Sequence, residues 1–416
     1  MPNTFAFPQW VSMDALRLLL NKLEVVSCFN TEWQKEFEQE FPIGSVTQVK
    51  IPQSWLIRDG LGYNPQGINR LTTTVNCNQI LGVDFEWDSF EEALNMERSR
   101  EEIRKQYLEP AVAQMAQETD SRAANFAMLN TNNFVGVLGT DPNTVTTFAQ
   151  ARQRMFELAC PPGGEKSLCI PPQFSTSMVP ALQTLLNPQD DISKQFKEGS
   201  LGKLHGFDVY ECMSLWRFTA GTQNATGTTI NTTNVNNGGN QLGLVSTAAD
   251  TFNPGDIFTI ANVNQVNPRT RRTLSTTLKQ FVVLQPYTAI GSSNAADFLI
   301  ISPAIFGPGS QYQNVDALPV NGAALTPWPG TASPNGKTSA TGLVIHGDAF
   351  GFAGVKLEEP RATEMTSQTR DPETRAALRF IRMFDPVQSK MINRWDSVFG
   401  FGQLYADSCA VRIQGA

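Results

Sequence analysis

Apolar and polar positions alternate along two runs near the N-terminus. In VTQVKIPQSWLI (46–57) the apolar positions include Val49, Ile51, Trp55 and Ile57, and LTTTVNCNQILGVDFEW (71–87) has apolar residues at most of its odd positions. A period of two predicts strands that each bury one face. RDGLGYNPQGIN (58–69) lies between them and is rich in turn residues, so the pair is expected to form one long hairpin with a broad tip.

The expected hairpin is unusually long. At about 3.3 Å per residue the second strand would extend roughly 55 Å, well beyond a common strand. A two-stranded hairpin is marginally stable in water, so its apolar face needs a surface to cover it. That surface is either another subunit or later strands of the same chain, and the pattern leaves both interpretations open.

Helical periodicity flanks the hairpin on both sides. MDALRLLLNKLEVV (13–26) places Leu16, Leu19 and other apolar residues on one face, which predicts an amphipathic helix. A much longer helix is expected from Phe90 to Leu129. Pro110 lies within that pattern and cannot donate a hydrogen bond, which predicts a bend or two helices end to end.

The middle of the chain divides by composition. TVTTFAQARQRMFELA (144–159) is expected to be a helix, and SLCI (167–170) and LHGFDVYEC (204–212) are expected to be strands of a compact α+β domain. From Phe218 to Gly342 only nine of 125 residues are charged, against 62 of 291 elsewhere. Short strand-like runs such as DIFTIA and KQFVVLQ, separated by turn residues, predict that this β-block (residues 218–342) is a small all-β domain.

The residues after the β-block return to mixed strand character. LVIHGDAFGFAGVKLE (343–358) contains strand patterns, residues 376–405 predict two strands around the turn DPVQSK, and CAVRI (409–413) predicts a final strand. These strands are too few to form a domain alone, so they are expected to pair with elements before Phe218. The β-block would then be an insertion.

Composition narrows the class of protein. The chain has 416 residues, of which 41% are hydrophobic and 17% charged, with a net charge of −7, which is typical of a globular protein and argues against a general nucleic-acid binder. The first residues lack the features of a signal peptide, and no apolar run approaches the roughly 18 residues that span a bilayer. We therefore expect a cytoplasmic origin and no membrane partner.

Candidate catalytic patterns are weak. The six cysteines are scattered without a CxxC pair and are expected to be reduced thiols. The two histidines, His205 and His346, are expected to have structural roles, because a triad or zinc site needs more than they offer. GTASPNGKTS (330–339) does not have the glycine spacing of a phosphate loop, and Arg269–Arg272 are expected in an exposed turn. We predict no enzyme activity, no cofactor and no catalytic or metal site.

Five segments, taken in order, resemble a known family. They are GSVTQVKIPQSW (44–55), GKLHGFDVYEC (202–212), FNPGDIFTIANVNQVNPRTRRTLSTTLKQFVV (252–283), LVIHGDAFGFAG (343–354) and RFIRMFDPVQSKMINRWDSVFGFGQLYADSCAVRI (379–413). On these segments the chain is similar to the major capsid (coat) proteins of tailed bacteriophages with the HK-ninety-seven-type fold, in the subgroup with a telokin-like insertion domain.

The resemblance implies an α+β phage capsid fold with assigned parts. These are an N-terminal arm (1–41), an extended hairpin loop (42–88), a peripheral domain with a long spine helix (89–130 with 359–416), an axial domain (131–217 with 343–358) and the β-block as the insertion domain. It also implies hexamers and pentamers of the chain in a virion capsid around double-stranded DNA, assembled in the bacterial host cytoplasm. Scaffolding protein, portal and decoration protein are the further partners.

The extended loop of this family lies across a neighbouring subunit, which implies a set of subunit-contact residues on the hairpin and the N-terminal helix. The candidates are Leu16, Leu19, Val49, Ile51, Trp55, Ile57, Arg58, Arg70, Val75, Leu81 and Phe85. Two other classes of protein stay open. One is an encapsulin-like cellular compartment with the same fold, and the other is a soluble carbohydrate-binding or hydrolytic protein in which the β-block binds the ligand.

Overall fold

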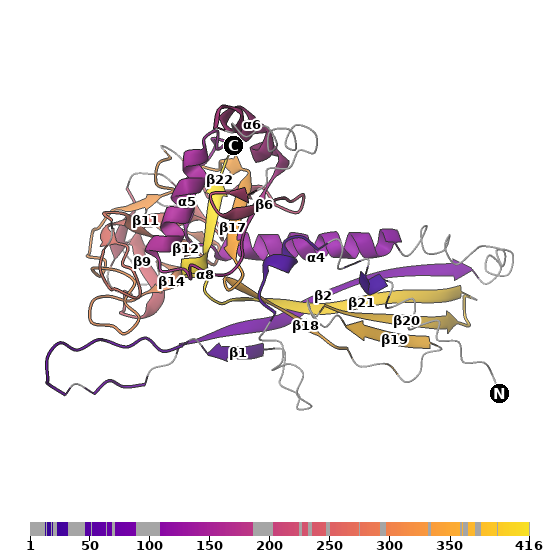
Figure 1. Ribbon diagram of the computed structural model, residues 1–416. Helices are drawn as coiled ribbons and strands as arrows, with labels where there is room; N and C mark the ends of the chain where they lie inside the picture. The colour runs from indigo at the N-terminus through magenta and orange to yellow at the C-terminus, as the bar shows by residue number, and fades with distance from the viewer. Residues whose placement is uncertain are drawn as a thin grey trace. The chain divides into compact units, whose positions relative to one another are not determined.

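The computed structural model (Figure 1) divides into two compact units, which are described separately. The first comprises Met1–Lys50, Thr72–Ala123 and Phe350–Leu404, and the second comprises Ile51–Leu71, Ala124–Ala349 and Tyr405–Ala416. The structure describes residues 13, 15–17, 19, 23–31, 46–50, 52–63, 65–68, 71–88, 109–185, 203–223, 227–231, 235–246, 250–273, 275–291, 297–331, 334–357, 360, 365–370, 376–388 and 390–415.

The first unit is built on one six-stranded antiparallel sheet. Its strands run side by side in Figure 1, and each pairs with its neighbour through the registers of the backbone ladder. The order is β1 (Val46–Lys50), β2 (Thr72–Asp88), β21 (Lys390–Gln403), β20 (Ala377–Asp385) and β19 (Met365–Arg370), with β18 (Phe350–Val355) also paired to β21.

Strand β2 is 17 residues long and has the predicted alternation. Val75 and Cys77 are buried, the remaining odd positions up to Phe85 are half-buried, and the even positions are exposed. Strand β21 pairs with β2 from Val75 to Asp88. Later strands of the same chain therefore complete this sheet, which is one of the two interpretations that the sequence pattern left open.

Aromatic rings fill the apolar face of this sheet. The ring centroids of Phe399 and Phe401 are 5.5 Å apart, and Phe352 lies 6.0 Å from Phe399. A second pair, Phe380 and Trp395, has its centroids 4.7 Å apart. Aromatic pairs at these separations stabilise a core beyond the area that they bury.

A side chain of helix α4 (Glu109–Asn130) binds the backbone of the N-terminal segment of this unit. The carboxylate of Asp120 accepts hydrogen bonds from the backbone N–H groups of Glu24, at 2.5 Å, and Val26, at 3.0 Å, where the chain forms the short helix η1 (Val26–Cys28). Met13, Ala15–Arg17 and Leu19 are helical, as expected. Residues 89–108 of the predicted long helix lie outside the described residues, so the bend at Pro110 stays a prediction.

The first sheet of the second unit combines distant parts of the chain. Helix α5 (Val145–Glu157) buries Phe148, Ala151 and Met155 and contacts the interior strand β22 (Ala410–Gln414). Helix α6 (Pro172–Leu185) follows β4. The order is β3 (Phe134–Gly136), β22 (Ala410–Gln414), β17 (Thr341–His346), β4 (Lys166–Ile170), β6 (Phe207–Glu211) and β5 (Lys203–Leu204).

The β-block contains the other six-stranded sheet of this unit, with its own apolar core. Buried residues of this core include Leu242, Phe258 and Phe281. The ring centroids of Phe258 and Phe281 are 5.8 Å apart. The order is β15 (Leu325–Pro327), β11 (Ile257–Asn264), β12 (Leu278–Val283), β14 (Phe298–Ile305), β9 (Gly239–Val245) and β8 (Thr229–Asn231). Two strand pairs complete the block: β10 (Thr251–Phe252) with β13 (Tyr287–Thr288), and β7 (Phe218–Thr219) with β16 (Thr338–Ser339).

Two strands pair differently from the expected domain boundaries. Strand β18 was expected in the axial domain (131–217 with 343–358), but it pairs with β21 in the first unit. Strand β22 was expected in the peripheral domain (89–130 with 359–416), but it fills the position between β3 and β17 in the second unit. The chain crosses between the units near Ala349 and Leu404, so short strands on either side of each crossing belong to different sheets.

The first strand of the hairpin is shorter than predicted. It ends at Lys50, and residues 52–63 form no strand, although Trp55 and Ile57 fit the period of two. Pro52 lacks the N–H that a ladder needs, and the described residues of this range, 52–63 and 65–68, are joined by side-chain hydrogen bonds in place of a ladder. The alternation in this segment therefore gives a loop.

Candidate functional site

The loop of residues 52–68, drawn in indigo in Figure 1, exposes a group of apolar side chains. Trp55 is 53% exposed, Ile57 93%, Leu61 100%, Tyr63 90% and Ile68 73%. Single exposed apolar residues are normal on a protein surface, but several together mark an interaction surface. We call these five residues the loop patch.

Glutamine side chains give the loop its shape. The Gln66 side chain accepts a hydrogen bond from the Leu56 N–H at 2.8 Å and donates one to the Leu56 carbonyl at 2.5 Å. Gln53 Nε2 donates to the Gly67 carbonyl at 3.1 Å. These amide groups take the place of a facing strand, so the two sides of the loop stay joined without a backbone ladder.

A side chain of the β-block also contacts the loop, within the second unit. Arg271 donates to the carbonyls of Trp55, at 2.8 Å, and Gln311, at 3.0 Å. Gln311 in turn donates to the Gly67 carbonyl at 2.9 Å. Arg271 has a left-handed backbone with φ of 55°, in a turn capped by the Asn267 side chain.

The sequence predicted that Arg269–Arg272 lie in an exposed turn. Arg269 and Arg272 are exposed, but Arg271 is half-buried and holds the loop. No local sequence signal identifies this role, because the partners of Arg271 are backbone carbonyls in distant segments.

The predicted subunit-contact residues divide into three groups. Trp55, Ile57 and Arg58 are exposed on the loop. Leu16, Leu19, Val49 and Val75 are buried within their own chain, and Leu81 and Phe85 are half-buried. Ile51 and Arg70 lie outside the described residues. Of the described candidates, the three loop residues are therefore the most accessible to a second subunit.

The second unit also contains a polar cavity of about 330 Å³. Its lining includes Gln150, Gln153, Arg154 and Glu157 from α5, and Gln280 from β12. Burial lowers the pKa of Arg154 to about 10, and the nearby charge of Glu157 partly offsets this effect. The residues that line this cavity include no serine, cysteine or histidine.

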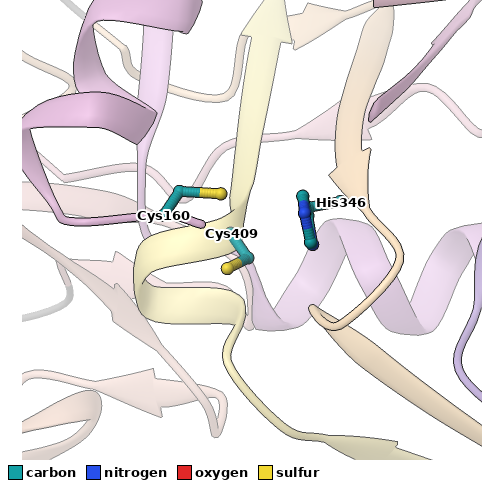
Figure 2. Close-up of side chains that lie close together, drawn as sticks. All are labelled: Cys160, His346 and Cys409. Atoms are coloured by element: carbon teal, nitrogen blue, oxygen red, sulfur yellow. The ribbon is translucent and has the colours of Figure 1, made fainter. Parts of the chain in front are cut away.

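Cys160, His346 and Cys409 meet at one end of the first sheet of the second unit (Figure 2). One potential ligand atom from each residue lies within 4.8 Å of the others, and all three side chains are buried. The pKa of the Cys409 thiol is lowered, chiefly by a hydrogen bond with Cys160. The same hydrogen bond, together with burial, raises the pKa of Cys160. The sequence predicted no metal site because these residues are far apart along the chain.

No family model matches the chain, and no curated protein matches it. Among solved structures it is similar to one from Mycobacterium phage Che8, with 11% identity, a TM-score of 0.46, and coverage of 94% of this chain and 90% of that chain. It is also similar to the capsid of cyanophage P-SCSP1u, with 13% identity, a TM-score of 0.42, and coverage of 90% and 84%.

A third similar structure is the virus-like particle from Pyrococcus furiosus, with 6% identity, a TM-score of 0.40, and coverage of 98% of this chain and 100% of that chain. Among the described residues, no helix is long and apolar enough to cross a membrane.

Proposed function

We propose that the chain is the major capsid protein of a tailed bacteriophage, a subunit that assembles with copies of itself into an icosahedral shell. The observation that carries this proposal is the loop patch. Five apolar side chains are exposed on a loop of defined shape, between two strands of an extended sheet. Such a patch is stabilised when a second subunit covers it.

The five ordered segments that resemble the capsid family support the same function, and four of them lie outside the loop. In this proposal residues 1–41 are the arm, residues 42–88 the extended loop, and the β-block the insertion domain. The sheet of the first unit is the core of the peripheral domain, and the sheet that contains β3 and β22 is the core of the axial domain. The loop patch lies on a neighbouring subunit within hexamers and pentamers.

The proposed shell encloses double-stranded DNA without sequence-specific binding. A net charge of −7 is compatible with this role, because a closed shell confines DNA mechanically and does not need to bind it tightly. Scaffolding protein and portal are proposed as assembly partners, and assembly is proposed to take place in the bacterial host cytoplasm. Expansion of a procapsid would follow, as the resemblance implies.

Electron microscopy of the purified chain, alone and co-expressed with the scaffolding protein of its own genome, tests the proposal. Closed shells or tubular polyheads are the expected result. A strictly monomeric protein under all scaffold and salt conditions would overturn it. Particles that contain a cargo enzyme instead of DNA would identify the chain as the subunit of an encapsulin-like compartment and not of a phage capsid.

A further inference from the structure

Sheet register brings together two of the three side chains in Figure 2, His346 and Cys409. Ile345 of β17 is paired with Ala410 of β22 in an antiparallel ladder. The next residue of β17 is His346, and the residue before Ala410 is Cys409, so the ladder places these two side by side at the same end of the sheet. Cys160 comes to them from the segment that links α5 to β4.

The segment after Cys160 holds the imidazole in place. His346 Nε2 lies 2.7 Å from the Gly163 carbonyl, and the backbone N–H of Asp348 lies 3.2 Å from Nδ1. In the tautomer whose Nε2–H donates to Gly163, the Nδ1 lone pair accepts the Asp348 N–H, and a metal ion bound at Nδ1 would replace that hydrogen bond. A backbone carbonyl that accepts the second ring N–H is the usual support of a metal-bound histidine.

Gly164 allows this close approach. It has a φ of +86°, and a Cβ built on it would lie 2.7 Å from His346 Nε2. The Cys160–Gly164 segment therefore needs glycine at this position to pack against the imidazole. The Asp348 carboxylate lies 3.6 Å from His346 Nδ1 and is half-exposed, so it lies between the buried cluster and solvent.

We propose that Cys160, His346 and Cys409 form a zinc-binding site, with the fourth position taken by Asp348 or a water molecule. Two thiolates and an imidazole are ligands that Zn²⁺ prefers in proteins. Zn–S bonds of about 2.3 Å and Zn–N bonds of about 2.0 Å place tetrahedral ligand atoms roughly 3.5 Å apart. The three atoms lie within 4.8 Å of one another, so shifts of about 1 Å suffice to bind the ion.

The metal would join the end of α5 to two strands that are far apart in sequence. Strand β17 begins at the end of the β-block, and β22 is the last strand of the described residues. A structural zinc ion contributes its binding free energy to folding, because the unfolded chain lacks a preformed site. This inference does not depend on the proposed shell function, since each of its tests uses the isolated chain.

The first test measures metal in the wild-type chain. The protein is purified under reducing conditions from cells supplied with zinc, passed through gel filtration and analysed by mass spectrometry for metals. The expected content is about one zinc ion per chain. Titration of the metal-free, reduced chain with Co²⁺ should produce a thiolate-to-cobalt charge-transfer band and the visible bands of a tetrahedral site.

Variants then assign the ligands. Cys160→Ser, His346→Gln and Cys409→Ser should each reduce the zinc content to less than about one-tenth of an ion per chain. Cys212→Ser, which removes a buried thiol outside the cluster, and His205→Gln, which removes the other histidine, are the matched controls and should retain the metal. Asp348→Asn should alter the visible cobalt bands if its carboxylate is the fourth ligand and leave them unchanged if water is.

Three results would overturn the proposal. The first is a wild-type chain with neither bound zinc nor a cobalt spectrum, which needs no variant to fold. The second is zinc that all three cluster variants retain, which would place the ion elsewhere. The third is a Cys160–Cys409 disulfide in peptide maps of wild-type chain purified without reductant and with its free thiols blocked at lysis, because both thiols would then be consumed.

Discussion

The guanidinium carbon of Arg412 lies 5.0 Å from the centre of the Trp328 ring. The same carbon lies 4.9 Å from the centre of the Phe218 ring, and the two ring centres are 5.4 Å apart, so the cation contacts a pair of adjacent aromatic rings. Arg412 is fully buried in β22 and donates a hydrogen bond to the Met128 carbonyl at 2.9 Å. A side chain of the last strand is thus enclosed by residues at both ends of the β-block.

Removal of this cation should destabilise the second unit strongly. Burial lowers the pKa of Arg412 to about 9, and the charge of buried Asp256 partly offsets this effect. Arg412→Ala removes the cation–π contacts, leaves a cavity and leaves Asp256 without its positive charge, at an expected cost of about 3–5 kcal/mol. Chemical denaturation of the isolated chain measures the free energy of unfolding.

Two further variants separate charge from packing. Arg412→Met combined with Asp256→Asn should cost less than Arg412→Ala, because no buried charge is left and the volume is largely kept. Arg269→Ala removes an exposed arginine and should change the unfolding free energy by less than about 0.5 kcal/mol. If Arg412→Ala behaves like Arg269→Ala, the aromatic site does not stabilise the unit.

Asp256 should make stability depend on pH. Its carboxylate accepts hydrogen bonds from Trp328 Nε1 at 3.1 Å and the Asn253 N–H at 2.7 Å, yet burial raises its pKa to about 6. Between about pH 4 and pH 6 the folded chain keeps a proton that the unfolded chain has released. The contribution of Asp256 to the unfolding free energy therefore falls as the pH rises through this window, by up to about 3 kcal/mol.

The measurement compares the wild-type chain with Asp256→Asn at pH values below and above this window. The asparagine variant does not titrate, so the difference in unfolding free energy between the two proteins isolates Asp256. Asp120, whose pKa is also raised to about 6 by burial, is present in both proteins and cancels. A difference that stays constant with pH would contradict the prediction.

Alternation predicted the long strand well because it reports burial on one face. Strand β2, and β20 and β21 around their turn, have the expected positions. The same rule was wrong for Trp55 and Ile57, where Pro52 interrupts the ladder and Gln66 replaces a facing strand. The pattern identifies apolar faces but does not identify the hydrogen-bond partner that a strand requires.

The candidate sites depend on contacts that sequence patterns do not contain. His346 and Cys409 are neighbours because of a register between β17 and β22, and no motif marks that register. Arg271 reaches the loop through a backbone turn with positive φ. Likewise, β18 follows β17 of the second unit in sequence but pairs with β21 in the first unit. Strand β22 follows β21 of the first unit but pairs with β17 in the second.

A charge in the loop patch should block assembly without unfolding the subunit. Ile57 is 93% exposed, so Ile57→Asp should change the unfolding free energy of the isolated subunit by less than about 0.5 kcal/mol. If a neighbour covers it, each contact buries an unpaired charge at a cost of about 2 kcal/mol or more, which reduces association more than tenfold. Sedimentation and electron microscopy measure the yield of shells.

The controls for this variant use other exposed and buried residues. Val320→Asp adds the same charge at an exposed position of the β-block, 60% accessible, and should leave assembly intact. Val75→Asp, at a position 3% exposed in the subunit's own sheet, should unfold the subunit. Equal losses of stability and assembly in Ile57→Asp would assign the loop an intramolecular role.

The β-block should be removable because its two ends are joined. Phe218 pairs with Ser339 and Thr219 with Thr338, and the Gly336 N–H donates to the Gly221 carbonyl at 3.0 Å. Deletion of residues 222–335 with a short Gly/Ser bridge keeps this strand pair and leaves β17 complete. The expected product is soluble and folded but less stable, because Met128 and Phe134 lose their packing against Trp328 and become exposed.

Hydrogen exchange tests whether the remaining sheet is intact. Amides of β17 and β22 should stay protected in the deletion variant, since their ladder partners β4 and β3 are retained. A wider deletion, of residues 218–339, also removes the pair β7 and β16 and should be less stable than the narrower one. Insolubility of both deletion variants, even after Phe134→Thr reduces the newly exposed apolar surface, would make the β-block an integral part of the core.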